Sequence, residues 1–199
     1  MMPLVSKPIL PATTSYITPP NEIQYVTAGF KEQAADSFWM RAIQDTHYCE
    51  KQLATNVCKN KSWFYNLIEL VTDLSPDFSE SYYYGGLSLT IFIGDQKGAT
   101  LIFDKATAHF KYDWPMLYLA GYHALFEEKN RLKAARLYLR AADNGAPSWV
   151  RLSAAKLAGS ENDLEFAKNV LDQLIKQEAE PLWIEGLRKK IEDFEKQKK

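Results

Sequence analysis

The chain reads YYGGLSLTIFIGDQKGATLIFDKATA from Tyr83 to Ala108 and YLAGYHALFEEKNRLKAARLYLRAAD from Tyr118 to Asp143. The two segments align without a gap at a shift of 35 residues, and small and aromatic residues recur at the same offsets. The matched pairs include Tyr83 and Tyr118, Gly86 and Gly121, Ala99 and Ala134, Phe103 and Tyr138, Lys105 and Arg140, and Ala106 and Ala141. A period of about 34 residues with such offsets is typical of stacked helix–turn–helix units. The repeat therefore predicts paired α-helices over this stretch.

Helix packing explains why small and aromatic residues recur at the matched positions. Two antiparallel helices approach closely only where small side chains lie at their crossing, and the matched glycines and alanines supply such side chains. We expect the rings of Phe103 and Tyr138 to lie between neighbouring units. A single unit cannot bury its apolar face alone, so several units must stack.

Helical periodicity extends the array on both sides of the matched pair. It predicts an all-α fold of four helical hairpins, over residues 22–76, 78–111, 115–144 and 148–177, followed by a final helix over 181–197. The final helix carries one apolar stripe, made of Trp183, Leu187, Ile191 and Phe194, as a helix that shields the last interface should. The expected organisation is an N-terminal arm (1–21), the helical repeats (22–180) and a C-terminal capping helix (181–199).

Three segments depart from a regular repeat. Residues 1–21 contain five prolines, which exclude a regular helix and predict an extended arm; they are Pro3, Pro8, Pro11, Pro19 and Pro20. Residues 45–61 are expected to form a long loop inside the first hairpin. Residues 88–93 are rich in β-branched and apolar side chains, but they lie in the matched unit, so we interpret them as buried helix.

The two cysteines, Cys49 and Cys58, both lie in the predicted loop. Their spacing is not that of a CxxC metal or redox motif. Two interpretations stay open. The cysteines are either unrelated thiols or a disulfide that closes the loop, and a disulfide would require an oxidising compartment.

Composition and charge argue against several classes of function. The 199 residues include 24 basic and 25 acidic side chains, for a net charge of −1. This balance gives no electrostatic reason to expect a nucleic acid or an anionic membrane as partner. No window holds 18 or more consecutive apolar residues, so we expect no membrane span in this chain.

Motifs for catalysis or cofactor binding are missing from the sequence. GxxxxGK[ST], GxGxxG and GxSxG do not occur. His47 and His123 each have a glutamate about one helical turn further on, but neither pair has a third ligand nearby, and a metal site needs at least three. We therefore expect no cofactor, no metal and no enzymatic activity.

Aromatic residues cluster on the predicted first helices of the hairpins. Rigid aromatic side chains are favoured interface anchors because they bury a large area at little entropic cost. The candidates for a partner-binding groove are Tyr83, Leu87, Tyr118 and Tyr122, together with His123 and Phe126. The alternative interpretation is that these side chains pack in the core.

Several segments resemble those of a known family. They read ADSFWMRAIQ (Ala35–Gln44), WFY (Trp63–Tyr65), LVTDLSPDF (Leu70–Phe78) and YYGG (Tyr83–Gly86). In these segments the chain resembles bacterial tetratricopeptide repeat (TPR) proteins over about residues 22 to 180, and more narrowly an envelope-associated group of them. The segment RLYLRAADNG (Arg136–Gly145) also resembles a Sel1-type repeat, a close relative.

The resemblance implies a TPR-like solenoid, a right-handed superhelix of antiparallel helix pairs whose first helices line a concave groove for peptides or partner domains. It implies a protein–protein interaction scaffold or adaptor. The alternative is a structural subunit that assembles with itself, as a homo-oligomer, or within an envelope-associated complex. Members of this group often carry an N-terminal membrane anchor, and we expect no such span within the given sequence. Both an envelope-associated or periplasmic location and a cytoplasmic one stay open.

Overall fold

A computed structural model describes residues 19–51, 61–158, 164–176 and 178–197. These residues form helices and connecting turns and contain no β-strand, which confirms the all-α prediction. The α-helices are α1 (Lys31–Lys51), α2 (Trp63–Leu74), α3 (Ser79–Ser88), α4 (Gln96–His109), α5 (Trp114–Phe126), α6 (Arg131–Asp143), α7 (Ser148–Ala158), α8 (Leu164–Lys176) and α9 (Pro181–Gln197). A 3-10 helix, η1 (Asn21–Tyr25), precedes α1, and a π-helix, η3 (Leu89–Ile93), continues α3.

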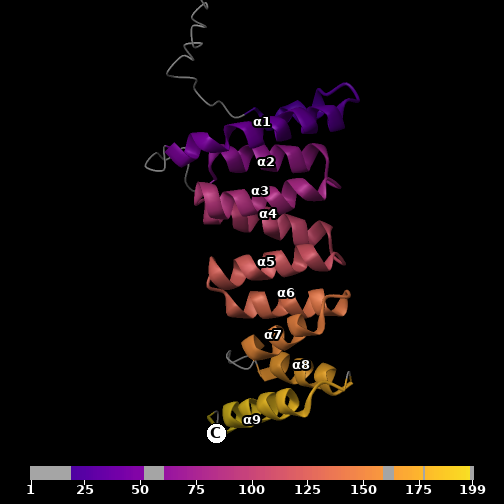
Figure 1. Ribbon diagram of the computed structural model, residues 1–199. Coiled ribbons are helices and arrows are strands. Elements are labelled where there is room, and N and C mark those ends of the chain that lie inside the picture. The colour runs from indigo at the N-terminus through magenta and orange to yellow at the C-terminus, as the bar shows by residue number, and fades with distance from the viewer. Residues whose placement is uncertain (1–18, 52–60, 159–163, 177, 198–199) are drawn as a thin grey trace, which may run out of the picture.

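The helices are stacked in the order of the chain. Figure 1 shows them crossing the molecule one after another, from α1 at one end to α9 at the other. Each helix packs mainly against the helices next to it in sequence, and the pairs α1–α2, α3–α4, α5–α6, α6–α7 and α8–α9 are in extensive contact. One main core runs through the stack, from Ala42 in α1 to Ile191 in α9.

The first helix differs from the expectation at both of its ends. Residues 26–30 are not helical, and Ala28 and Gly29 have positive φ angles of 50° and 90°, so the first α-helix begins at Lys31 rather than near residue 22. Helix α1 then continues to Lys51, whereas the loop was expected to begin at Asp45. The reason is local, because residues 45–51 contain no glycine or proline that would end a helix.

The glycines of the matched pair lie where an aromatic ring crosses their helix. A Cβ atom added at Gly86 would lie 2.5 Å from Cζ of Phe103, and one added at Gly121 would lie 2.6 Å from Cε1 of Tyr138. Each ring therefore packs on the glycine of its own hairpin. Phe103 also contacts the next unit, since its ring centroid lies 5.0 Å from that of His123 in α5.

The turns between paired helices repeat as well. In the second hairpin Gly94 has a φ of 70°, and the amide of Asp95 donates to the carbonyl oxygen of Leu89 at 2.9 Å. In the third hairpin Lys129 has a φ of 57°, and the amide of Asn130 donates to the carbonyl oxygen of Ala124 at 2.9 Å. These positions correspond at the shift of 35, so the repeat extends to the turn geometry.

Cations at another matched position join consecutive hairpins. Lys105 in α4 donates to Thr72 Oγ1 at 2.6 Å and contacts the Asp73 carboxylate, both near the end of α2. Arg140 in α6 donates to the carbonyl oxygen of Thr107 at 3.1 Å, near the end of α4. A positive charge is favourable at a helix C-terminus, where carbonyl groups lack intrahelical partners.

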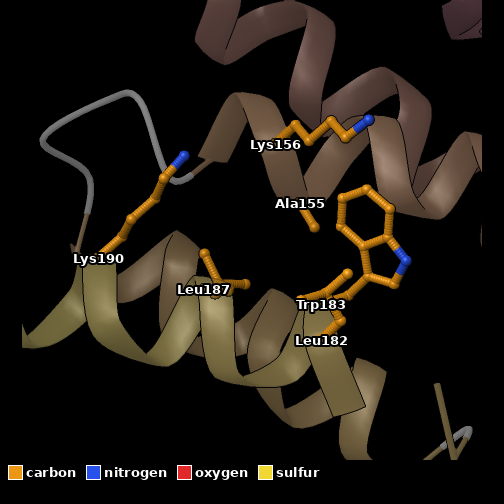
Figure 2. A pocket seen from close by; sticks show the side chains of 7 residues that line it. Ala155, Lys156, Leu182, Trp183, Leu187 and Lys190 are labelled. Atoms are coloured by element: carbon orange, nitrogen blue, oxygen red, sulfur yellow. The ribbon is translucent and has the colours of Figure 1, made fainter. Parts of the chain in front are cut away.

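Helix α9 covers the end of the stack. Its Leu187 and Ile191 are buried, and it packs against α7 and α8. A small hollow remains between α7 and α9, with Lys156 and Trp183 on one side and Lys190 on the other (Figure 2). The Lys156 ammonium lies 4.5 Å from the centre of the Trp183 ring, a favourable cation–π distance.

Candidate partner-binding surface

An open apolar hollow of about 570 Å³ lies between α1 and α3. Its lining comes from α1, α2, the residue before α3, α3 itself and η3. The lining residues are Trp39, Ile43, Thr46, Phe64, Phe78, Glu80, Tyr84, Ser88 and Phe92.

Helical spacing places these side chains on facing surfaces. On α1 the lining residues Trp39, Ile43 and Thr46 are four and three residues apart, which puts them on one helix face. On α3 and η3 the lining residues recur every four positions, from Glu80 through to Phe92. At one end the Trp39 and Phe78 rings meet edge to face with centroids 5.7 Å apart, so the two elements touch there.

The π-helix η3 determines which apolar side chains remain exposed. Leu89 and Ile93 are buried, whereas Ile91 and Phe92 are exposed, so the interpretation of residues 88–93 as wholly buried helix is wrong for the latter two. A π-helix adds a residue to the turn and so shifts the residues that follow around the helix axis. Phe92, at 58 % exposure, thereby joins Tyr84 (55 %) and Ile43 (49 %) at the hollow.

A second, smaller hollow of about 230 Å³ continues the first toward α5. It is lined by Ser79, Glu80, Tyr83, Tyr84, Asp113, Pro115 and Met116, so it shares Glu80 and Tyr84 with the first. We call the residues that line the two hollows the first-helix surface, because most come from α1, α3 and α5, the first helices of three hairpins. The charged residues in both linings are Glu80 and Asp113, and no lysine or arginine is among them.

The predicted groove residues fall into four groups. Tyr83 is half-buried and belongs to the first-helix surface. Leu87 and Tyr118 are also half-buried, but they line neither hollow. Tyr118 instead stacks on Tyr138 at a centroid distance of 5.3 Å and meets Trp149 edge to face at 5.3 Å.

Tyr122 and Phe126 form a separate aromatic pair on α5. Both side chains are nearly half exposed, and their ring centroids lie 4.4 Å apart. Neither residue lines the two hollows. The pair is therefore accessible, as expected of a partner contact, but lies outside the first-helix surface.

His123 is not a groove residue, which corrects the expectation. Its side chain is 2 % exposed, with Nδ1 3.1 Å from Thr90 Oγ1 and Nε2 3.0 Å from Thr100 Oγ1. It lies on the same face of α5 as the buried residues Met116 and Ala120, at helical spacing, and this face packs against α4.

The hydrogen bonds of His123 indicate its protonation state. The Thr90 hydroxyl donates to the carbonyl oxygen of Gly86 at 3.0 Å, so it is left to accept a hydrogen bond from Nδ1. Nε2 then accepts from the hydroxyl of Thr100. This arrangement fits a neutral imidazole, and burial lowers the pKa of His123 below 6.5, although the nearby Glu128 carboxylate acts in the opposite direction.

Trp39, Ile43 and Phe92 were not predicted as groove residues, and Tyr84, although part of the aromatic cluster on the first helices, was not among the groove candidates; all four line the larger hollow. The signal present in the sequence was the four-residue spacing of Glu80, Tyr84, Ser88 and Phe92. The repeat alignment could not supply the α1 side, because α1 lies outside the aligned pair.

The expectations for the two cysteines and for His47 with Glu50 fall outside the part of the chain that the structure describes. Cys58 and the side chain of Cys49 lie outside the described residues, and so do the side chains of His47 and Glu50. Among the side chains that are described, no group of three or more histidine, cysteine, aspartate or glutamate residues is placed to hold a metal ion.

Within the described part of the chain, no helix has both the length and the hydropathy needed to cross a bilayer. Comparison with protein-family models, with curated proteins and with solved structures gives no match.

Proposed function

We propose that this chain is a non-enzymatic scaffold or adaptor that binds a peptide or a partner protein on the first-helix surface. The observation that carries the proposal is the apolar hollow between α1 and α3, where Ile43, Tyr84 and Phe92 are each about half exposed. Large apolar side chains gathered in one hollow mark interaction sites more often than scattered ones do.

The chemistry of the surface suits a protein ligand. Tyrosine, tryptophan and phenylalanine are enriched in the buried centres of protein interfaces, and tyrosine and tryptophan also among the residues that carry most of the binding energy. Here they surround a hollow with a single charged lining residue, Glu80. An apolar segment with a basic residue would match both features, because the carboxylate would select its register and orientation.

We also propose that the stack is a TPR-like solenoid, a right-handed superhelix of helix pairs. Three repeating features support this: the packing of an aromatic ring on a glycine, the turn with a left-handed residue, and the cation at the end of the preceding hairpin. A solenoid places equivalent helices on one side, which would make the first helices a continuous binding face.

A self-assembling structural subunit is the second candidate function. Ile175 and Leu182 lie on either side of the α8–α9 turn, and Leu182 is 72 % exposed. Light scattering over a range of protein concentrations tests this alternative. The alternative is supported if the wild-type mass rises with concentration while a Leu182→Glu variant stays monomeric. A wild-type protein that stays monomeric at every concentration contradicts it.

A peptide-display selection tests the binding proposal. The full chain is used to select peptides from a random library, and the selected peptides are then titrated against Tyr84→Ala and Phe92→Ala. We expect saturable binding that weakens at least about tenfold in each variant, since a buried aromatic anchor contributes roughly 2 kcal/mol or more.

The matched control is Tyr112→Ala, which removes the same side chain from an exposed position in the α4–α5 turn. This variant should bind the selected peptides as the wild type does. Peptides that bind all three variants equally, or the recovery of no saturable binder, would show that the first-helix surface is not the site.

A further inference from the structure

The lining of the first-helix surface has aromatic and acidic side chains but no basic ones, and this composition restricts the chemistry of its ligand. Its linings contain six aromatic residues, Trp39, Phe64, Phe78, Tyr83, Tyr84 and Phe92. Its charged groups are the carboxylates of Glu80 and Asp113. Among the described residues, no cation forms an ion pair with Glu80, which is exposed. The surface therefore favours an apolar segment that brings its own positive charge.

The N-terminal arm of this chain has that composition. Residues 1–18 contain Lys7, three prolines and several aliphatic side chains, and they contain no aspartate or glutamate. Proline fixes φ near the value of the polyproline II conformation, which has no internal hydrogen bonds and loses little entropy on binding. Segments of this kind dock in grooves lined by aromatic side chains.

We propose that residues 1–18 bind to the first-helix surface of their own molecule, with Lys7 placed near Glu80. This inference rests on the proposed function, because it assigns the same surface a resident ligand. The arm then acts as an internal competitor that an external partner must displace.

The arm is long enough to reach the surface. Eighteen residues in the polyproline II conformation span about 56 Å at 3.1 Å per residue. Trp39 lies only about 12 Å along α1 from Lys31, the first residue of that helix, at 1.5 Å per residue. The stretch from Glu80 to Phe92 extends about 18 Å on the same basis, so six or seven extended residues would cover it. Residues beyond those needed for binding are left to bridge the distance to residue 19, which is followed by η1 and α1.

An internal ligand has a measurable consequence for affinity. An intramolecular segment competes at an effective concentration set by its linker, in the millimolar range for short flexible connections. The apparent affinity for an external peptide is reduced by the fraction of molecules in which the surface is open. Weakening the arm should therefore tighten partner binding without any change in the surface itself.

Photo-crosslinking in the full chain tests the proposal directly. The photoreactive residue p-benzoylphenylalanine is placed at position 9, next to Lys7 and Pro8 and in the aliphatic part of the arm. We expect crosslinks within single molecules that map by mass spectrometry to α1, α3 or η3 around the larger hollow. We expect Lys7→Glu and Glu80→Lys each to lower the yield at least about fivefold, and the double variant Lys7→Glu/Glu80→Lys to recover at least half of it.

The control for the charge reversal is Glu192→Lys, which makes the same change at an exposed position on α9 and should leave the yield unchanged. Circular dichroism of each variant confirms that the helices persist. Crosslinks that map outside the first-helix surface, crosslinks found only between two molecules, or a double variant that recovers no yield would each overturn the proposal. None of these outcomes depends on an external peptide, so failure here leaves the peptide-display result to decide the proposed function independently.

Discussion

At the scale of single residues, two matched glycines of the repeat have no room for a methyl group. Gly86 and Gly121 lie under the rings of Phe103 and Tyr138, and both rings are buried. An added Cβ would meet ring carbons at less than 3 Å, and a ring cannot bend away as the end of a flexible chain can. These glycines are therefore required by close approach rather than by their backbone angles.

We predict that Gly121→Ala destabilises the fold by about 1–3 kcal/mol, the usual cost of overpacking a core. Gly186→Ala on α9 is the matched control, because a Cβ there meets nothing within 4 Å. The control should be neutral or stabilising by up to about 1 kcal/mol, since alanine is the better helix former. Urea denaturation measures both variants, and equal effects at the two positions would contradict this account.

His123 makes stability depend on pH. Burial lowers its pKa in the folded protein below the ordinary value of 6.5. As the pH falls below 6.5, the unfolded chain takes up a proton at this residue before the folded protein does. The unfolded state binds more protons in this window, so the free energy of unfolding decreases as the pH falls.

The charged side chains around the His123 ring also act on its pKa. Glu128, Glu127 and Asp104 raise the pKa of His123, and Lys133 lowers it, but burial outweighs them. We predict that wild-type stability falls between pH 7 and pH 5.5 more steeply than that of His123→Gln, by at most about 1.4 kcal/mol per pH unit. Glutamine keeps hydrogen-bonding groups for the two threonines but does not titrate. Urea denaturation at a series of pH values measures the difference, and parallel pH profiles would refute it.

At the scale of helices and turns, two residues at equivalent positions of the repeat differ in the hydrogen bonds that they accept. Asp95 and Asn130 each cap the second helix of a hairpin, accepting hydrogen bonds from the amides of Gly98 and Lys133 respectively. Asp95 is buried and also accepts from the amides of Ser62, at 2.7 Å, and Lys61, at 3.3 Å. One carboxylate thus joins the start of α4 to the start of α2.

We predict that Asp95→Ala costs about 3 kcal/mol of stability, because it removes a helix cap and leaves a further buried amide without its acceptor. Asn130→Ala should cost only about 1 kcal/mol, the usual value for an exposed cap. Thermal and urea denaturation of the two variants give the comparison. Similar losses would mean that the link between α2 and α4 does not contribute to stability.

At the scale of the whole molecule, contacts are local along the stack. Each described helix packs against neighbours in sequence, and the two ends of the stack are not in contact (Figure 1). Stability in such an arrangement is close to a sum of the units and the interfaces between them. A defect at one end should therefore remain near that end.

We predict that Leu187→Asp, which places a charge in the buried interface of α9, speeds amide hydrogen exchange mainly in α7, α8 and α9. Helices α2–α4 should keep exchange rates within about twofold of the wild type, because no interface of theirs is changed. Glu185→Ala on the exposed face of α9 is the control. Equal acceleration in all helices would show one cooperative unit and would count against the proposed solenoid.

The sequence by itself determined the helices and most of their ends. These depend on neighbours in the chain: apolar spacing forms the helix faces, and Asp95 and Asn130 cap helices that start at the next residue. The Tyr138 ring was expected between neighbouring units, whereas it packs on Gly121 of its own hairpin. The start of α1 and its continuation past Asp45 were missed, because no strong start or stop residue marks them.

Only the tertiary structure decided which surface stays open. His123 and Tyr122 are adjacent in sequence, yet one is enclosed by Thr90 and Thr100 while the other faces outward. The hollow between α1 and α3 depends on how two hairpins are rotated against each other, and on the π-helix that turns Phe92 outward. That rotation results from packing across an interface between segments far apart in the chain, so a pattern read along one helix cannot specify it.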